Sequence, residues 1–266
     1  NAEGMPTIAL SEEQRYRFDT RGWLLLPGLL SESQVDEMKD FCYRLKKDTD
    51  SIPEHHRSSI GGPLESLTDH PAVVGFMDEF VSSGYAGEDC YGFRLEGTFL
   101  TIRSKGDGQF APHGGRGLFN FPGNSHTYRM NNDRAHSGLT RVVWELNPVR
   151  RGDGGTLFLT GSHKGAFPPP ASTASKDSDL WEDYECPAGS ALIFTEAITH
   201  SGVDWVNEDV DRVAVFNCYN SLWAQWHRLN LDHEKIEAMP EKRRTLFRGV
   251  WELGGNREYS LENRSL

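Results

Sequence analysis

The chain has 266 residues, of which 37% are hydrophobic and 25% are charged, so its composition excludes a disordered or fibrous protein. The 28 Lys and Arg residues stand against 39 Asp and Glu, and a net charge of −11 without a basic stripe predicts no nucleic-acid partner. No apolar run approaches the roughly 18 residues of a membrane span, so we expect no membrane partner either.

The four cysteines are scattered and none forms a Cys-x-x-Cys pair. This spacing is typical of neither a zinc site nor the disulfide framework of a small secreted domain. The chain does not open with a charged and then apolar signal segment. We therefore expect the protein to be cytoplasmic and its cysteines to be reduced thiols. The four cysteines are Cys42, Cys90, Cys186 and Cys218.

The first third of the sequence predicts helices around one short strand. Ser11 is a plausible N-cap, and the apolar run 23–26 stops at a Pro-Gly pair, as a short strand would. Ser31 and a Gln three residues later resemble a capping box before an amphipathic helix. Residues 49–69 are polar and predict a loop, and a further helix is expected over 71–81.

From Cys90 onward the hydrophobic period changes to two, which is the period of half-buried strands. Glycine-rich turns separate the runs, and many short strands with such turns predict a sandwich or barrel. Residues 164–180 contain three consecutive prolines and are expected to form an irregular insertion. Further strands are expected within 139–146, 156–160, 190–195 and 212–219.

We find no repeat and no linker long enough to divide the chain, and therefore expect one domain over 7–266. Its helical part would span 11–85, and a C-terminal extension would follow the last strand over 221–266.

Three ordered segments resemble the phytanoyl-CoA dioxygenase family, whose members are non-haem Fe(II)- and 2-oxoglutarate-dependent oxygenases. They are the opening Gly-Trp-Leu-Leu-Leu-Pro-Gly at 22–28, the stretch Gly-Asp-Gly-Gly-Thr through Gly-Ser-His-Lys at 152–164, and the strand with its distal histidine at 187–202. The resemblance covers most of residues 11–220. It implies a mainly β fold with flanking helices, namely a double-stranded β-helix, which is a cupin-like jelly roll.

The same resemblance implies where the cofactors bind. His113 corresponds to the proximal iron ligand and His200 to the distal one, while Arg212 would hold the far carboxylate of 2-oxoglutarate. An arginine suits that role because its planar guanidinium can grip a carboxylate through two hydrogen bonds. Arg103 and Thr140 lie on strands expected to face the barrel interior, where they would contact 2-oxoglutarate or the substrate.

The sequence departs from the family at the third iron ligand. A facial triad uses two histidines and one carboxylate, but Gly115 stands where the carboxylate is expected. A water or another carboxylate such as Glu196 would complete the iron site, or chloride would fill the open position as in the related iron halogenases. In a third alternative the metal site has decayed and the chain is a binding protein.

The resemblance thus predicts an enzyme that uses Fe(II), 2-oxoglutarate and O₂ to hydroxylate an unactivated C–H bond of a small organic substrate. The alternatives are a chloride-dependent halogenase and a non-catalytic small-molecule-binding protein on the same fold. The identity of the substrate does not follow from these motifs, because function depends on the site rather than on the fold.

Overall fold

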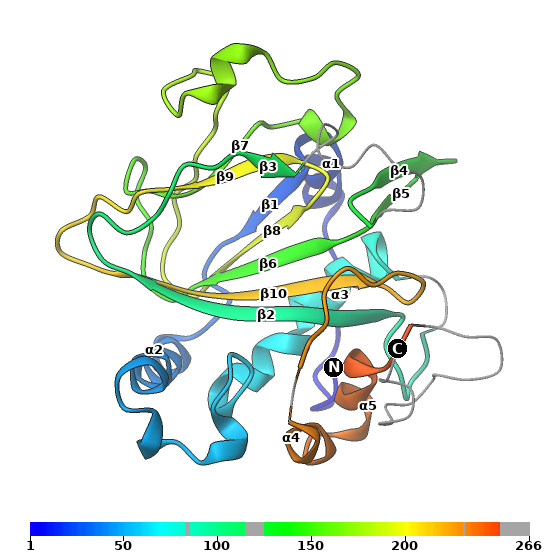
Figure 1. Ribbon diagram of the computed structural model, residues 1–266. Coiled ribbons are helices and arrows are strands. Elements are labelled where there is room, and N and C mark those ends of the chain that lie inside the picture. Colours follow the sequence, from blue (N-terminus) through cyan, green and yellow to red (C-terminus); the bar gives the residue numbers. More distant parts are fainter. Residues whose placement is uncertain (83–85, 115–124, 231, 251–266) are drawn as a thin grey trace.

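Two antiparallel β-sheets form the centre of the computed structural model, which describes residues 1–82, 86–114, 125–230 and 232–250 (Figure 1). The larger sheet has the order β1-β8-β6-β10-β2, and the smaller sheet has the order β3-β9-β7. The larger sheet consists of β1 (Trp23–Leu26), β8 (Ser190–Thr195), β6 (Thr140–Glu145), β10 (Arg212–Ser221) and β2 (Phe93–Arg103). The smaller sheet consists of β3 (His113–Gly114), β9 (Thr199–Val203) and β7 (Gly155–Phe158).

One face of the larger sheet and the smaller sheet enclose an aromatic core. Trp23 of β1 stacks on Phe158 of β7 with ring centroids 5.1 Å apart, and Phe194 of β8 meets Phe158 edge to face at 5.2 Å. Side chains alternate between the two faces along a strand, and Val143 of β6 and Phe216 of β10 also point into this space. The space between the two sheets is therefore the interior in which inward-pointing polar groups would form a site.

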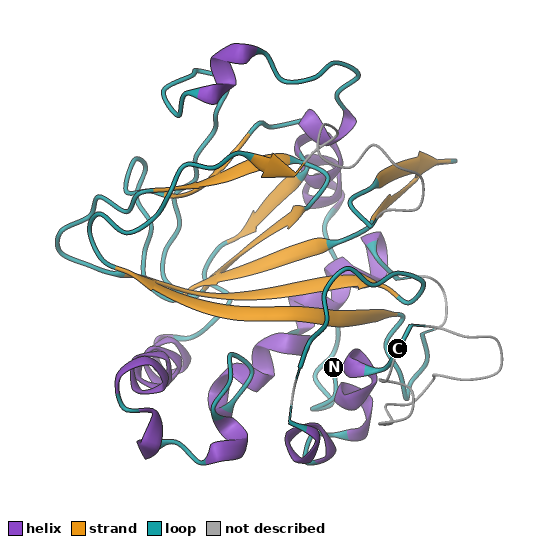
Figure 2. Cartoon of the chain, in the orientation of Figure 1, coloured by secondary structure: helices purple, strands orange, loops and turns teal. Residues whose placement is uncertain are grey.

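The other face of the larger sheet is covered by helices, as Figure 2 shows. They are α1 (Glu12–Arg21), α2 (Glu32–Lys47) and α3 (Pro71–Phe80), with three short 3₁₀ helices between α2 and α3. Both capping boxes form, because the hydroxyls of Ser11 and Ser31 accept from the backbone N–H three residues on. Two more short helices, α4 (His233–Glu237) and α5 (Glu241–Arg244), follow the last strand.

The strand-rich fold with flanking helices confirms the coarse prediction from sequence, and all of the predicted strands occur. The predicted loop at 49–69 contains the 3₁₀ helices Thr49–Ser51, Glu54–His56 and Gly62–Asp69 instead of irregular chain. Closure of the two sheets into a complete double-stranded β-helix and the single-domain boundaries remain predictions.

A small hairpin of β4 (Tyr128–Asn131) and β5 (Arg134–Ser137) was not expected from the polar sequence around it. Its two turn residues, Asn132 and Asp133, have φ values of 48° and 62°. Both lie in the left-handed region that tight two-residue hairpin turns require, and Asn and Asp tolerate it better than most residues.

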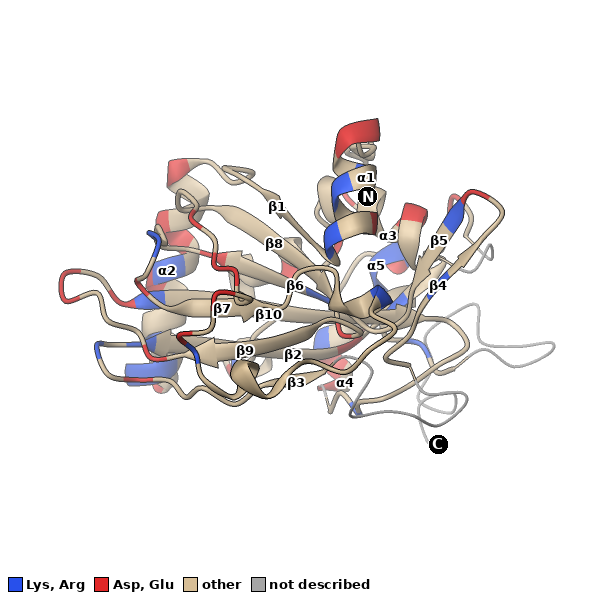
Figure 3. Cartoon of the chain, turned by 90° about the horizontal axis from the view of Figure 1, so that it is seen from above, with Lys and Arg blue, Asp and Glu red and all other residues tan. Residues whose placement is uncertain are grey.

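Charged residues lie mainly on the helices, on the loops at the strand ends and near the hairpin tip (Figure 3). Within the described ranges, none of the helices has the length and apolar character needed to cross a bilayer. Charged residues on the inner face of the larger sheet are therefore exceptions, and burying each of them requires a partner.

Candidate functional site

Two histidines far apart in the sequence lie opposite each other in the smaller sheet. His113 of β3 and His200 of β9 are direct register partners, and their ring centroids are 4.2 Å apart. His200 is 5% exposed and also contacts the ring of Phe194 at 4.7 Å, whereas His113 is exposed. The structure thus brings together the two residues that the sequence predicts as iron ligands.

The backbone sets which nitrogen of each ring is available. Nδ1 of His113 lies 2.8 Å from the carbonyl oxygen of Ala111, and Nδ1 of His200 lies 3.1 Å from that of Ile198. A carbonyl oxygen only accepts, so each Nδ1 carries a proton, and in the neutral form of either ring Nε2 is the nitrogen with the lone pair. Metal-binding histidines are commonly oriented in this way by a second hydrogen bond.

Burial keeps the His200 ring neutral. It lowers the pKa of His200 to about 4, although the nearby carboxylate of Glu196 opposes the shift. A neutral imidazole is the form that binds a metal ion.

Glu196 lies in the turn between β8 and β9 and faces the histidine pair. One of its oxygens, Oε1, accepts a hydrogen bond from Nε of Arg141 at 2.6 Å, and Nη2 of the same guanidinium forms an ion pair with it at 2.6 Å. The other oxygen, Oε2, is 3.7 Å from Nε2 of His200, which is too far for a direct hydrogen bond. Although burial opposes it, the charge of Arg141 lowers the pKa of Glu196 to about 2, so the group is an anion.

A second buried ion pair lies on the inner face of the larger sheet. Nη2 of Arg212 lies 2.5 Å from Oε1 of Glu145, and its Nε lies 3.2 Å from both oxygens of that carboxylate. The hydroxyl of Tyr184 donates to the same carboxylate at 2.6 Å. Arg212 and Glu145 are 1% and 0% exposed, so the arginine predicted to hold 2-oxoglutarate is already paired inside the protein.

Arg103 is the register partner of Arg212 across β2 and β10, so both side chains are on the inner face. Arg103 is half-buried, and its one direct contact with a described acceptor is a long 3.5 Å approach to the carbonyl of Val203. Burial and the charge of Arg212 lower the pKa of Arg103. The predicted inward orientation of Arg103 is thus found.

Thr140 does not have the inward orientation that we expected. Its side chain has the same parity on β6 as Val142 and Trp144, which pack toward the helices, and its hydroxyl donates to the carbonyl of Gly138 at 3.0 Å. Neighbouring residues of a strand point to opposite faces of the sheet, so the position of Thr140 on β6 places its side chain on the helix side and not on the inner face. Gly115, the position of the missing carboxylate, lies outside the described residues.

Sequence reasoning missed the residues that hold these charges. Arg141 and Glu145 stand four positions apart in the apolar strand β6, so both point to the same inner face. The sequence did contain a signal for these residues, namely two charged residues at an even spacing inside an apolar strand. Their partners, Glu196 and Arg212, are 55 and 67 residues away, and only the folded chain pairs them.

The histidine pair fits an iron site with two protein ligands. Among the residues that the structure describes, no group of three or more His, Cys, Asp or Glu side chains is arranged to hold a metal ion. The imidazole nitrogens suit Fe(II), and the other positions would be left for 2-oxoglutarate, O₂ or water. The roles of His113, His200, Glu196, Arg103 and Arg212 toward a cofactor remain predictions.

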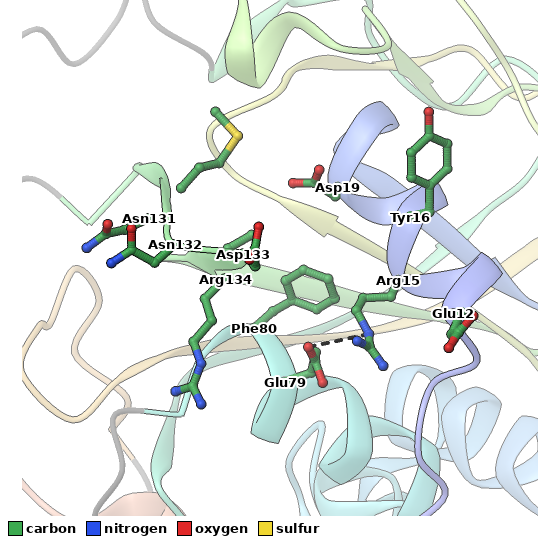
Figure 4. A pocket seen from close by; sticks show the side chains of 12 residues that line it. Glu12, Arg15, Tyr16, Asp19, Glu79, Phe80, Asn131, Asn132, Asp133 and Arg134 are labelled. Carbon is green, nitrogen blue, oxygen red and sulfur yellow. Dashed lines mark ion pairs between the residues drawn. The ribbon is translucent and has the colours of Figure 1, made fainter.

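A cavity of about 530 Å³ lies elsewhere, between α1, α3 and the β4–β5 hairpin (Figure 4). Its polar wall includes Arg15, Glu79, Asp133 and Arg134, and Arg15 pairs with Glu79 at 3.5 Å. Neither histidine of the pair lines it. The cavity is therefore separate from the histidine pair on the inner face of the sheets.

Solved structures share this fold, although no protein-family model and no curated protein matches the sequence. Apo HygX from Streptomyces hygroscopicus is similar over 86% of this chain and 94% of its own, with a TM-score of 0.65 and 19% identity. HygX has also been solved with iron and with nickel, 2-oxoglutarate and hygromycin B.

Two further similar structures come from nogalamycin biosynthesis. SnoN, an alpha-ketoglutarate-dependent epimerase, matches over 81% of this chain and 82% of its own, with a TM-score of 0.56 and 18% identity. SnoK, an alpha-ketoglutarate-dependent carbocyclase, matches over 89% and 95%, with a TM-score of 0.56 and 15% identity. The chain therefore has the fold of non-haem iron enzymes that depend on 2-oxoglutarate, also called alpha-ketoglutarate. At these identities the likeness concerns the fold alone, and membership of the phytanoyl-CoA dioxygenase family remains a prediction.

Proposed function

We propose that the protein is an Fe(II)- and 2-oxoglutarate-dependent oxygenase that hydroxylates an unactivated C–H bond of a small organic substrate. The observation that carries the proposal is the pairing of His113 with His200, each with Nδ1 bound to a backbone carbonyl and Nε2 left as a metal ligand. The shared fold of 2-oxoglutarate-dependent enzymes that act in natural-product pathways supports it.

In this proposal His113 and His200 hold Fe(II), and the bound iron with 2-oxoglutarate and O₂ supplies the oxidising chemistry. Glu196 places a fixed negative charge beside His200, and Arg141 prevents that carboxylate from taking up a proton. The surrounding rings of Phe194 and Phe158 exclude water from the buried side of His200. The protein thus contributes position, charge and a dry environment, and the cofactor contributes the reaction.

Hydroxylation is favoured over halogenation by the position of Glu196. A halogenase needs an open anion position beside the two histidines, but a fixed carboxylate lies 3.7 Å from Nε2 of His200. Negative charge so close to the metal position repels chloride. The histidine pair also favours an enzyme over a non-catalytic binding protein. A protein that only binds a small molecule does not require two imidazoles that both donate from Nδ1 to a backbone carbonyl.

The proposal is tested by adding Fe(II) and 2-oxoglutarate to the protein without air. We expect the weak visible charge-transfer band of the chelate, with a 1:1 iron stoichiometry, followed by succinate formation when O₂ is admitted. Adding chloride should leave the band unchanged. A folded protein that shows no band at millimolar 2-oxoglutarate would contradict the proposal and favour a binding protein, whereas a chloride-dependent band would favour a halogenase.

A further inference from the structure

An exposed phenylalanine lies on the inner face of the larger sheet, among side chains that are mostly buried. Phe99 of β2 and Phe216 of β10 are register partners, and their rings stack with centroids 4.2 Å apart and an interplanar angle of 11°. Phe216 is 7% exposed but Phe99 is 45% exposed, so the free surface of this aromatic pair belongs to Phe99. Because β2 is the edge strand of its sheet, the ring lies where the inner face meets solvent.

The ring of Phe99 lies close to the charged groups beside the histidine pair. The guanidinium carbon of Arg141 is 5.6 Å from the centre of the Phe99 ring. Arg141 is paired with Glu196, whose Oε2 is 3.7 Å from Nε2 of His200. Only two side chains therefore lie between Phe99 and the ring that we propose as a metal ligand.

A second set of exposed aromatic side chains follows β10. The segment after this strand turns back across the ends of β10 and β2 (Figure 1), and it carries Trp223 and Trp226, which are 51% and 41% exposed. The buried carboxyl group of Glu96 on β2 accepts from the backbone N–H groups of Trp226 and His227 at 3.0 and 3.2 Å. Glu96 lies where the register between β2 and β10 shifts, and such irregularities re-aim a side chain. The carboxyl group thus holds this segment against the sheet.

The ring of His227 places the held segment next to Phe99. A Cβ on Gly97 would lie 3.4 Å from Cδ2 of His227, so the imidazole lies against the open backbone of this glycine. Gly97 is two residues before Phe99 on the same face of β2, about 6.6 Å along the strand. His227 and Phe99 are therefore neighbours on the inner face.

Trp226 is linked to the histidine pair through His126. The two rings meet edge to face with centroids 4.5 Å apart. Burial lowers the pKa of His126, and the charges of Glu196 and His113 also act on this ring, so His126 lies within electrostatic reach of the pair. Phe99 and Trp226 thus come from different elements and lie near the same centre.

We propose that Phe99 and Trp226 form an aromatic subsite for the substrate, and that the substrate is an uncharged compound with a planar aromatic ring. The inference rests on the proposed function, because it names the substrate class of the same centre. The free sides of the two rings would contact an aromatic ring by stacking or edge to face.

The charges near the two rings explain why an uncharged compound is expected. Arg141 is paired with Glu196, and the carboxyl oxygens of Glu96 accept from backbone N–H groups. The charged groups that contact the two rings or the segment between them are thus already satisfied within the protein. A charged compound at the two rings would lose hydration without gaining an ion pair, whereas stacking requires no charge.

The decisive comparison uses two neutral alcohols with the same carbon skeleton. 2-Naphthalenemethanol is planar and aromatic, and decahydro-2-naphthalenemethanol is its saturated counterpart. Each is titrated by calorimetry into the whole chain, first without metal and then without air in the presence of Fe(II) and 2-oxoglutarate. We expect the wild type to bind the aromatic alcohol about tenfold more tightly, because only a planar ring stacks. A merely apolar surface would favour the saturated alcohol, which has more apolar hydrogens to bury.

Single substitutions locate the preference. Phe99→Leu and Trp226→Leu should each reduce it about threefold to tenfold, because each removes a ring and keeps an apolar side chain. Phe99→Tyr should preserve it, since tyrosine has the same ring face. Phe167→Leu is the matched control, because Phe167 is 87% exposed and lies outside the strands of both sheets. Thermal unfolding of each variant confirms that it is folded.

Three results would overturn the inference. They are equal or tighter binding of the saturated alcohol by the wild type, an unchanged preference in both Phe99→Leu and Trp226→Leu, and a charge-transfer band that bound 2-naphthalenemethanol does not perturb. In each case the band itself still supports the proposed function. If no band forms but the aromatic preference and its loss in the variants are found without metal, the proposed function fails, and the two rings are the ligand site of a binding protein.

Discussion

His113 and His200 face each other across β3 and β9 as register partners, 87 positions apart in sequence, with ring centroids 4.2 Å apart. The same backbone pairing that joins the two strands therefore determines the spacing of the rings. Because each Nδ1 is also bound to a carbonyl two residues upstream, the rings are preoriented before any metal arrives. Preorientation of this kind reduces the conformational entropy that the side chains lose when a metal binds.

The first prediction concerns iron stoichiometry. His113→Ala and His200→Ala should each reduce Fe(II) binding from one ion per chain to near zero, because a single imidazole cannot hold the ion tightly. The measurement is iron content after anaerobic reconstitution and desalting. His55→Ala is the matched control, since His55 is exposed and lies on a short 3₁₀ helix outside the two sheets. Unchanged iron in His200→Ala would refute the assignment.

The second prediction concerns the buried pair of Glu196 and Arg141. Glu196→Gln leaves the guanidinium of Arg141 without its counter-charge, and we expect a loss of about 3 kcal/mol in the free energy of unfolding. Urea denaturation measures the loss. Adding Arg141→Met should recover most of it, because the two changes together remove both charges. Additive losses in the double variant would show that the two residues do not stabilise each other.

The third prediction is a pH dependence that arises at His163. This ring donates from Nε2 to the carbonyl of Asp19 at 2.9 Å and packs on Tyr128, and the charges nearest to it are Lys164 and the Asp19 carboxylate. Burial lowers its pKa to about 4 from the 6.5 of an unfolded chain. Between these two values the unfolded state binds the extra proton, so stability is lost as the pH falls from 6.5 toward 4.

His163→Gln tests this dependence, because glutamine can also donate to the carbonyl of Asp19 but does not titrate. Between pH 7.5 and 4.5, the free energy of unfolding of the wild type should fall by about 2 kcal/mol more than that of His163→Gln. Urea denaturation of both proteins at the two pH values measures the difference. Parallel losses in the two proteins would assign the acid sensitivity to other groups.

The fourth prediction compares two glycines with nearly the same positive φ angle. Gly22 ends α1 with φ 81°, and Gly152 lies in an exposed turn with φ 80°. A Cβ on Gly22 would lie 2.6 Å from Nδ1 of His163, whereas a Cβ on Gly152 would meet nothing within 4 Å. Gly152→Ala should therefore cost only the left-handed strain of about 1 kcal/mol.

Gly22→Ala should cost at least about 1–2 kcal/mol more than Gly152→Ala, since the His163 ring must also move. Thermal or urea unfolding of the two variants gives the difference directly. Equal losses would mean that the ring shifts without cost, and would weaken the case for a fixed His163 in the third prediction as well.

Local patterns were sufficient to predict the three long helices and most strands of the larger sheet, but not the β4–β5 hairpin or the 3₁₀ helices within 49–69. The N-cap at Ser11, the capping box at Ser31 and the alternation along β2 and β10 depend on neighbouring residues, so the sequence itself carries these signals. The pairing of His113 with His200 was also predicted, but through the family resemblance and not through their spacing.

The tertiary structure decided which charges meet. Arg212 was expected to be open to a cosubstrate, but Glu145 of the adjacent strand β6 neutralises it. Thr140 was expected on the inner face, but the parity of β6 turns it toward the helices. The sequence determines hydrophobic period and caps because these are local, whereas the partner of a buried charge depends on strand order and register, which arise only when distant segments pack together.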